Sequence, residues 1–344
     1  MIQLVQVYLL KCQKFVEDKK ILMFKRLSFN VLTITIVSMI MLMGIVVKTP
    51  DAYAAKFGSV SHIYAFGDSY SDNGASFEIS TQAVDAGVPG SFILPADPAL
   101  GIYDSEGRAT NGLTTVEVLS QNLQVGLTDY AVVGAKSGNG NYNAWLDDFQ
   151  DTGAFGQIEQ FTAELSGQVA DRNALYFIFI SANDLLEYVD FDLPGTVEEL
   201  SVQTVNNIGQ SLSNLAALGA NKFMVVNSSD IGIVPHIIEF DNTDEAVLFT
   251  KLVNELLPQK LEMLTEELGA EIVLYDHIAI SDQIRSKPDQ YTLTNLNYPC
   301  QPTSPIEPAC SLPDEYYFWD EIHPTARVHQ IIGEDMAIFV KNQQ

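Results

Sequence analysis

Short apolar runs recur along residues 55–344 at intervals that leave room for helices between them. Most are apolar at consecutive rather than alternate positions, which is typical of parallel strands buried on both faces. Each run is short enough for a single strand. The predicted strands are His62–Phe66, Asp129–Val133, Leu175–Ser181, Lys222–Asn227 and Glu271–Tyr275.

Longer segments between these runs carry apolar residues three and four positions apart, the spacing of one helical face. The clearest are Thr114–Leu123, Gly156–Leu165, Val197–Leu218 and Leu248–Leu268. Strands that alternate with helices favour a parallel sheet with helices on both sides. We therefore predict an α/β protein, a three-layer α/β/α sandwich around a five-stranded parallel sheet.

Two long segments, residues 74–112 and 285–315, are dotted with glycine or proline and show no clear periodicity. Loops of this length on the rim of a sheet commonly shape a site or cover it. We predict a single domain over residues 55–344, with these two segments as rim insertions. Ligands of such sheets bind at the carboxyl ends of the strands.

The first 54 residues resemble a targeting segment and are set apart from the fold. Lys25 and Arg26 precede an unbroken apolar stretch, residues 31–47, and a small-x-small pattern ends at Ala54. This order predicts a Sec-type signal peptide cleaved after Ala54, and hence a secreted or periplasmic protein. An uncleaved membrane anchor is the alternative, because the apolar stretch is at the short end of what spans a bilayer. Residues 1–22, before Met23, are an over-long leader or reflect a misplaced start.

The chain is strongly acidic, with a formal net charge of −26. Setting residues 1–54 aside leaves 11 basic and 41 acidic residues, a net charge of about −30. A surface of this sign repels polyanions, so we expect no nucleic-acid partner. Solubility outside the cell accounts for the acidity. The sequence does not indicate an oligomeric state.

Beyond the leader, Cys300 and Cys310 are the only cysteines, and they flank a short proline-rich loop. In an exported chain they form a disulfide; two free thiols are the alternative. No Cys-x-x-Cys and no histidine pair on one helical face is present, so we predict neither a metal site nor a cofactor.

Two segments carry candidate chemistry. Ser69 lies in Gly67-Asp68-Ser69, directly after the first predicted strand, and Asp320 stands three residues before His323. A serine hydroxyl attacks an ester only when a nearby imidazole accepts its proton, and a carboxylate commonly orients that imidazole. The other histidines have no acidic residue at such a spacing, and we assign them structural or surface roles: His62, His236, His277 and His329.

These segments resemble the GDSL lipase/esterase family of SGNH hydrolases, and the resemblance spans roughly residues 60–340. Its first block matches residues 66–74, with Tyr70 where leucine is usual. The second resembles residues 130–135 and the third residues 181–184, where Ser181 replaces an expected glycine. The last block matches residues 320–325.

The resemblance implies a flavodoxin-like fold and a site on its rim. It assigns Ser69 as nucleophile, His323 as general base and acid, and Asp320 as the residue that orients the imidazole. It builds the oxyanion hole from the backbone N–H groups of Ser69 and Gly134 and the side chain of Asn183. Each preformed donor of this kind lowers the barrier by roughly 3–4 kcal/mol.

Within the family, the chain is similar to bacterial secreted lysophospholipases, phospholipases A and glycerophospholipid:cholesterol acyltransferases. This implies a lipid or lysophospholipid substrate in membranes or micelles. A carbohydrate or short-chain acetyl esterase is an alternative, and an inactive surface-binding module is a third. Apolar residues near the predicted rim favour lipid over a polar groove: Phe92, Ile93, Leu94, Leu185, Leu186, Tyr188 and Val189.

Overall fold

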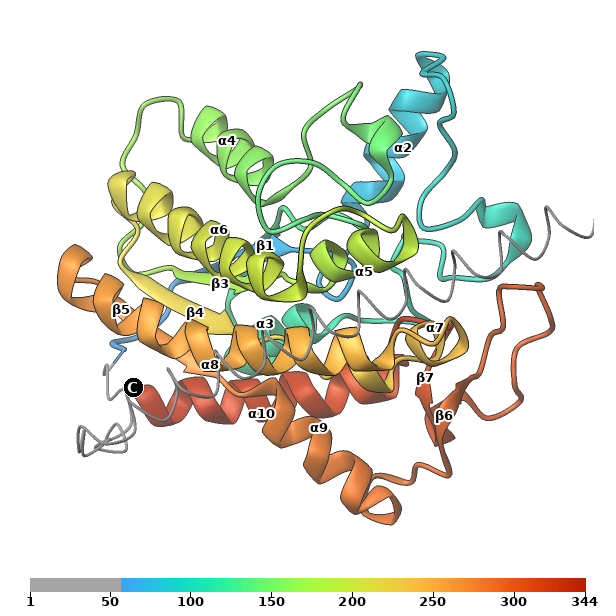
Figure 1. The fold of residues 1–344 in the computed structure, drawn as a ribbon. Coiled ribbons are helices and arrows are strands. Elements are labelled where there is room, and N and C mark those ends of the chain that lie inside the picture. The colour runs from blue at the N-terminus through green and yellow to red at the C-terminus, as the bar shows by residue number, and fades with distance from the viewer. Residues whose placement is uncertain (1–56) are drawn as a thin grey trace, which may run out of the picture. The chain divides into compact units, whose positions relative to one another are not determined.

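A computed structural model describes residues 57–344, and the predicted signal peptide and its cleavage point lie outside this part of the chain. The described part is built around a five-stranded parallel sheet in the order β2-β1-β3-β4-β5 (Figure 1). The strands are β1 (His62–Gly67), β2 (Gly126–Asp129), β3 (Leu175–Phe179), β4 (Lys222–Val226) and β5 (Glu271–Tyr275).

The inner strands β3 and β4 explain the apolar runs. Every residue of β3 and β4 is buried, as expected for parallel strands covered on both faces. Even Lys222 is buried at the start of β4, where its ammonium group donates to the Ser59 carbonyl at 3.0 Å. The edge strand β2 is instead half-exposed.

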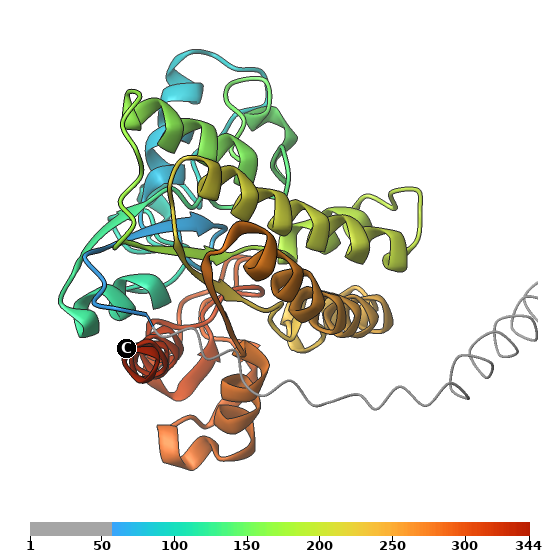
Figure 2. The same cartoon turned by 90° about the vertical axis from the view of Figure 1, so that its left-hand side faces the viewer.

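Helices cover both faces of the sheet (Figures 1 and 2). Helices α3 (Thr115–Leu123) and α10 (Ala326–Gln343) pack together on one face. The other face carries α4 (Ala154–Leu165), α6 (Val197–Ala217) and α8 (Thr243–Leu268), with α6 between the other two. The predicted three-layer α/β/α sandwich with five parallel strands is confirmed.

The strand order is that of flavodoxin-like doubly wound sheets. In such sheets the strand order reverses between β1 and β3, since β2 is added on one side of β1 and β3 to β5 on the other, and ligands bind beyond the strand ends at that point. Ser69 follows β1 and Asn183 follows β3. The topology therefore brings these two residues to the site that the fold favours.

One strand differs from the prediction. The second predicted strand covered residues 129–133, but β2 ends at Asp129. Residues 130–132 continue beside β1, where the Tyr130 and Val132 N–H groups donate to the carbonyls of Ala65 and Gly67. Their burial against the core produced the apolar run, whereas the true edge strand before them is half-polar.

The remaining elements surround the strand ends. They include α2 (Ala75–Asp85) within the first predicted insertion, and β6 (Asn295–Pro299), which pairs in parallel with β7 (Tyr316–Phe318) near the second. Shorter helices are α5 (Ala182–Asp190), α7 (Pro235–Glu239) and α9 (His277–Ser286). Single 3₁₀ turns lie at Pro98–Leu100, Ala144–Leu146, Ile231–Ile233, Pro288–Tyr291 and Pro313–Glu315.

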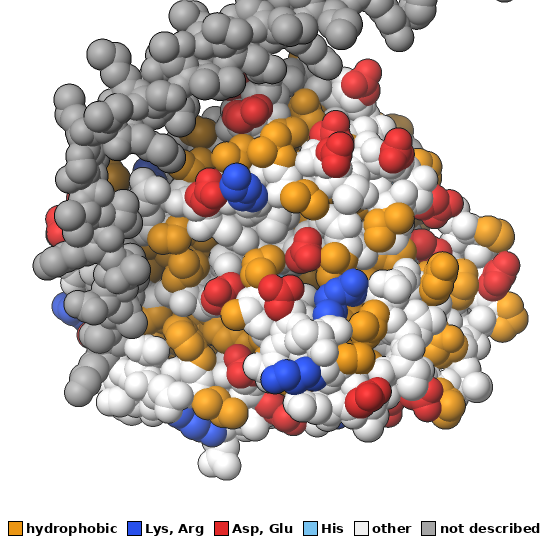
Figure 3. Space-filling view, turned by 60° about the horizontal axis from the view of Figure 1, so that its bottom comes forward, with side chains coloured by type: hydrophobic (Ala, Val, Ile, Leu, Met, Phe, Trp, Pro, Cys, Tyr) orange, Lys and Arg blue, Asp and Glu red, His pale blue; other side chains and the backbone are white. Residues whose placement is uncertain are grey.

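The surface reflects the acidic composition. On the face shown in Figure 3, Asp and Glu side chains are spread among apolar and neutral ones, with few Lys or Arg side chains between them. None of the helices within residues 57–344 combines the length and apolar character needed to cross a bilayer.

Candidate active site

Ser69 lies on a tight turn at the end of β1. The Asp68 carbonyl accepts hydrogen bonds from the N–H groups of Ser71 and Asp72, both at 3.0 Å, and the Asp68 carboxylate accepts one from Tyr70 N–H. Gly67 is required before this turn, because a Cβ atom there would lie 2.6 Å from the Phe179 carbonyl oxygen of β3. The strand end thus holds the serine against the neighbouring strand.

The side chains predicted to form a triad meet at this turn. Ser69 Oγ lies 2.8 Å from His323 Nε2, and His323 Nδ1 lies 2.7 Å from Asp320 Oδ2. All three residues are buried, with at most 8 % of any one exposed. Residues that are 254 positions apart along the chain therefore share one chain of hydrogen bonds.

Asp320 and His323 form a rigid turn directly after β7. Asp320 Oδ1 accepts the N–H groups of Ile322 at 2.8 Å and His323 at 2.6 Å. The His323 carbonyl in turn accepts Trp319 N–H at 2.7 Å. The three-residue spacing lets one carboxylate bind both the backbone and the imidazole of His323.

The charges of the pair stabilise each other. Burial alone would raise the pKa of Asp320, but the adjacent His323 and the hydrogen bonds outweigh it, so this pKa lies below its ordinary value. Burial would lower the pKa of His323, but the Asp320 carboxylate outweighs that effect and raises it. An imidazole of this kind is well suited to accept a proton from Ser69 Oγ.

Two backbone donors expected to form the oxyanion hole are free of protein acceptors. Within residues 57–344, neither the Ser69 nor the Gly134 N–H donates a hydrogen bond to a protein atom. Gly134 has φ +80, and a Cβ there would lie 2.3 Å from Asn141 Oδ1. Only glycine fits this position without displacing Asn141, so the N–H at residue 134 is held in a conformation that other residues rarely adopt.

Asn183, in the first turn of α5, is the third candidate donor. One amide hydrogen is used in a 3.0 Å bond from Nδ2 to the Ala135 carbonyl, next to Gly134. A carboxamide NH₂ group has two hydrogens, so the second remains available. Ser181, where a glycine was expected, has φ −175 and so lies outside the left-handed region that favours glycine.

Carboxyl groups tie the Gly134 loop to the serine turn and to α5. Asp72 Oδ2 accepts Val133 N–H at 2.9 Å, and Asp184 accepts both the N–H and the hydroxyl of Ser137. Burial, only partly offset by these bonds, raises the pKa of both acids to about 6. The loop that carries Gly134 is therefore fixed on both sides.

Three residues that organise the site were given no role from the sequence. The Gln157 amide bonds both backbone groups of Gly67, at 2.9 and 2.7 Å. Tyr70, in place of the usual leucine, donates its hydroxyl to the Ile322 carbonyl at 3.2 Å. Tyr103 donates to Asp320 Oδ2 at 2.6 Å. All three contacts join residues at least 90 positions apart, so no local sequence pattern predicts them.

His236, assigned a structural or surface role from the sequence, has an acidic partner in the structure. Its Nε2 lies 3.0 Å from both carboxylate oxygens of Asp190, at the end of α5. Its backbone N–H donates to the Glu321 carbonyl at 2.9 Å. His236, Asp320 and His323 border one cavity of about 240 Å³. The acidic partner lies 46 positions away, so spacing along the chain did not reveal it.

The predicted disulfide is present, with the Cys300 and Cys310 Cα atoms 4.9 Å apart. The loop that it closes lies beside the site. Thr303 donates its N–H to Glu321 Oε1 at 2.8 Å, and its hydroxyl bonds the same carboxylate. Glu321 follows Asp320, so the stapled loop contacts the turn that carries the acid.

The apolar residues expected to mark a lipid channel divide into two groups. Leu94, Leu185 and Leu186 are in the hydrophobic core, at most 5 % exposed, and cannot line a channel. Phe92 is exposed and packs against Trp145 with ring centroids 5.4 Å apart. The apolar character of the three leucines therefore reflects packing in the core.

This chain belongs to the GDSL lipase/acylhydrolase family, a class of ester hydrolases. The family model described as GDSL-like Lipase/Acylhydrolase matches residues 63–336, which include the whole candidate site. The predicted family is thereby confirmed.

Among curated proteins, the chain is 26 % identical to the GDSL esterase/lipase At1g71691 of Arabidopsis thaliana, over 80 % of this chain and 81 % of that protein. It is 24 % identical to the thermolabile hemolysin of Vibrio parahaemolyticus, over 80 % of this chain and 63 % of the hemolysin. Among solved structures, an aryl esterase of M. smegmatis aligns with 13 % identity over 83 % of this chain and 100 % of that one, at a TM-score of 0.45.

Proposed function

We propose that this protein is a serine esterase that hydrolyses acyl esters of phospholipids or lysophospholipids through an acyl-enzyme. The observation that carries the mechanism is the continuous chain of hydrogen bonds from Ser69 Oγ through His323 to Asp320, at 2.8 and 2.7 Å. Family membership and relatives named esterase/lipase support the ester substrate.

The reaction follows from the roles of these groups. His323 Nε2 takes the Ser69 hydroxyl proton as Oγ bonds to the ester carbonyl carbon, and the carbonyl oxygen becomes negative. The N–H groups of Ser69 and Gly134 and the Asn183 amide stabilise that oxygen. His323 then gives its proton to the departing alcohol, leaving an acyl-serine. Water, activated by the same imidazole, releases the carboxylic acid and restores Ser69.

Exposed apolar side chains near the site support a lipid substrate. Phe240 lines the cavity beside His323 and is 59 % exposed. Phe191, directly after the helix that carries Asn183, is 56 % exposed, and Ile306 in the disulfide loop is 55 % exposed. Large exposed apolar residues around a site favour contact with acyl chains or a membrane surface. The likeness to a protein named hemolysin agrees with a membrane lipid as substrate.

We also propose that the protein is exported. The leader predicted at residues 1–54 supports this, and so does the Cys300–Cys310 disulfide, since such bonds persist in oxidising compartments. The same acyl-serine also allows transfer of the acyl group to another alcohol, and how well water is excluded decides between transfer and hydrolysis.

The test is a substrate profile of the wild-type protein beside Ser69→Ala. We expect release of fatty acid from lysophospholipid and diacyl phospholipid vesicles, and loss of this activity in Ser69→Ala. Strict preference for acetyl esters would replace the lipid assignment with the acetylesterase alternative. Adding a sterol acceptor and analysing products by mass spectrometry separates free fatty acid from sterol ester.

A further inference from the structure

Tyr103 comes from the first rim insertion, yet its side chain reaches the centre of the site. Its hydroxyl donates to Asp320 Oδ2 at 2.6 Å. We propose that Tyr103 is a positioning residue that fixes the Asp320 carboxylate and limits how strongly this carboxylate attracts the proton of His323. The insertion thereby becomes part of the catalytic machinery.

The bonds to Asp320 show why this hydroxyl matters. Oδ1 is occupied by two backbone N–H groups of its own turn, those of Ile322 and His323. Oδ2 is shared between His323 Nδ1 at 2.7 Å and the Tyr103 hydroxyl at 2.6 Å. Within residues 57–344, Tyr103 is the only side chain besides His323 that bonds Asp320.

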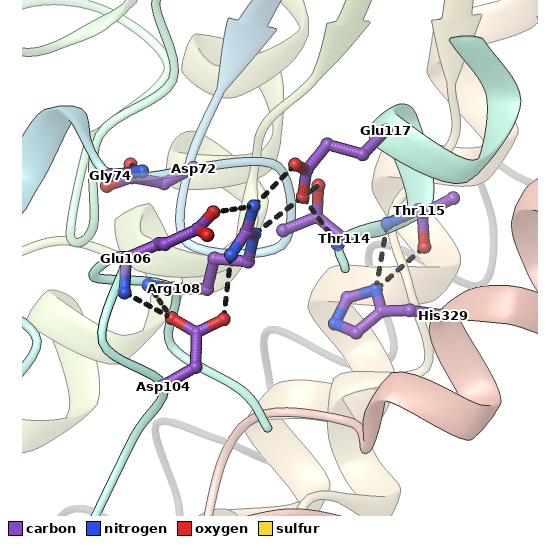
Figure 4. Close-up of polar contacts among 9 residues, drawn as sticks. All are labelled: Asp72, Gly74, Asp104, Glu106, Arg108, Thr114, Thr115, Glu117 and His329. Atoms are coloured by element: carbon purple, nitrogen blue, oxygen red, sulfur yellow. Dashed lines mark hydrogen bonds and ion pairs between the residues drawn. The ribbon is translucent and has the colours of Figure 1, made fainter. Parts of the chain in front are cut away.

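Tyr103 is held in place from both sides. Before it, the Ile102 carbonyl accepts the Trp319 indole N–H at 3.2 Å, which ties the insertion to the residue preceding Asp320. After it, Arg108 pairs with three carboxylates, as Figure 4 shows: Asp104 at 2.8 Å, Glu106 at 2.7 Å and Glu117 at 2.8 Å.

The ion pairs of Arg108 fix the insertion to the body of the protein. Glu117 lies in α3, where it also caps the helix by accepting Thr114 N–H at 2.9 Å (Figure 4). Arg108 is 7 % exposed and the Glu117 side chain 12 %, so their ion pair is shielded from water, whereas the Glu106 side chain is 69 % exposed. Gly74, just after the serine turn, passes so close that a Cβ there would lie 2.5 Å from the Glu106 carbonyl. The loop carrying Tyr103 is therefore anchored independently of substrate.

Because Tyr103 and His323 share Asp320 Oδ2, loss of the Tyr103 hydroxyl is expected to change the pKa of His323. A hydroxyl that donates to a carboxylate takes up part of its negative charge, so less remains to stabilise the imidazolium of His323. Removing the hydroxyl leaves the carboxylate free to attract the His323 proton more strongly. The base then loses its proton only at higher pH. The other titratable groups near the pair are Asp68, Tyr70, Glu321 and His329, and the substitution leaves all of them in place.

The experiment compares Tyr103→Phe with Tyr275→Phe on a soluble p-nitrophenyl ester. Tyr275 donates to Asp335 Oδ2 at the same 2.6 Å, so the control removes an equal bond outside the site. For Tyr103→Phe we expect kcat to fall about 10-fold with KM within about twofold. We expect the acid limb of the kcat/KM profile to move up by about half a pH unit. Tyr275→Phe keeps wild-type kcat and profile.

A second variant tests the anchoring. Trp319→Phe removes the indole bond to Ile102, and we expect the acid limb to move in the same direction by a smaller amount. The proposal is overturned if kcat falls in Tyr103→Phe without a displaced limb, since that is loss of structure alone. It is equally overturned if only KM rises, which would make Tyr103 a substrate contact, or if both tyrosine variants behave alike.

Discussion

Two histidines that line the same cavity, His323 and His236, are each paired with an aspartate, and only one of the two pairs belongs to a triad. The imidazole of His323 lies 2.7 Å from Asp320, with 10 % and 4 % of the two side chains exposed. The imidazole of His236 lies 3.0 Å from Asp190, with 21 % and 13 % exposed. The decisive difference is Ser69, which lies 2.8 Å from the second ring nitrogen of His323.

The comparison shows what makes a histidine–aspartate pair reactive. Both pairs orient an imidazole, so orientation alone does not define a catalytic base. His323 adds a nucleophile in reach and a buried, fully bonded acid that raises its pKa. His236 instead joins α5 to α7, and its N–H holds the Glu321 carbonyl. We therefore assign His236 to the support of the site.

The same substitution on the two histidines gives the largest contrast. His323→Ala removes the base that activates Ser69, and we expect kcat to fall by about 10⁶-fold, as when the histidine of another triad is removed. His236→Ala leaves the triad intact, and we expect kcat within about fivefold of wild type. Ester hydrolysis by both purified variants checks this. Equal losses would show that His236 takes part in the chemistry.

The paired acids give the next largest contrast. Asp320→Asn keeps the shape of the side chain but loses the charge that stabilises the imidazolium, and we expect kcat to fall about 10⁴-fold. For Asp190→Asn we expect less than a fivefold change, because no reacting atom depends on it. Steady-state kinetics of the two variants measure the difference. A severe loss in Asp190→Asn alone would reverse the roles assigned to the pairs.

The oxyanion hole is expected to contribute less than the triad. Asn183→Ala removes one donor, and we expect kcat to fall by about 10²- to 10³-fold with KM little changed. Asn183→Asp serves as a matched variant, since it keeps the size of the side chain and replaces the donor by an acceptor. An Asn183→Ala variant with wild-type kcat would show that the amide does not contact the developing charge.

The pH dependence follows from the raised pKa of His323. The imidazole must be neutral to accept the Ser69 proton, and Asp320 raises its pKa above the ordinary 6.5. Activity is therefore lost as the pH falls through that raised pKa, and we expect the midpoint of the acid limb of kcat/KM above 6.5. Asp68, whose burial raises its pKa to about 7, titrates in the same range. A kcat/KM profile from pH 5 to 9 checks this, and full activity at pH 5.5 would contradict it.

The smallest expected effect is on stability. The His236–Asp190 pair is partly exposed, and such pairs contribute about 0–1 kcal/mol. We expect Asp190→Asn to lower the free energy of unfolding by no more than about 1 kcal/mol, measured by urea denaturation. Asp190 also accepts the Tyr142 hydroxyl at 2.9 Å, so Tyr142→Phe gives a control for that bond. A loss of several kcal/mol would mean that the pair anchors α5 and α7.

The sequence was sufficient for features with a local signal. The buried strands β3 and β4 are apolar at almost every position. Ser69 and the Asp320–His323 pair each lie in a short motif that can be recognised in the sequence. The half-exposed edge strand β2 was misplaced, because its buried continuation is more apolar than the strand itself.

Contacts between distant segments could not be predicted in this way. Tyr103 meets Asp320 across 217 positions, and Gln157 meets Gly67 across 90. Each depends on how a loop or helix folds back onto the strand ends, which hydrophobic periodicity does not encode. The insertion at residues 74–112 was expected on the rim from its composition, but the contact of its Tyr103 with Asp320 is visible only in the folded structure.

The central claim is that His323 activates Ser69 and no other hydroxyl. The most direct measurement is labelling with a fluorophosphonate, followed by peptide mass spectrometry, in the wild-type protein and His323→Ala. We predict one adduct, on Ser69, that forms at least about 100-fold more slowly in His323→Ala. No adduct on Ser69 in the wild-type protein, or equal labelling rates in the two proteins, would contradict the account.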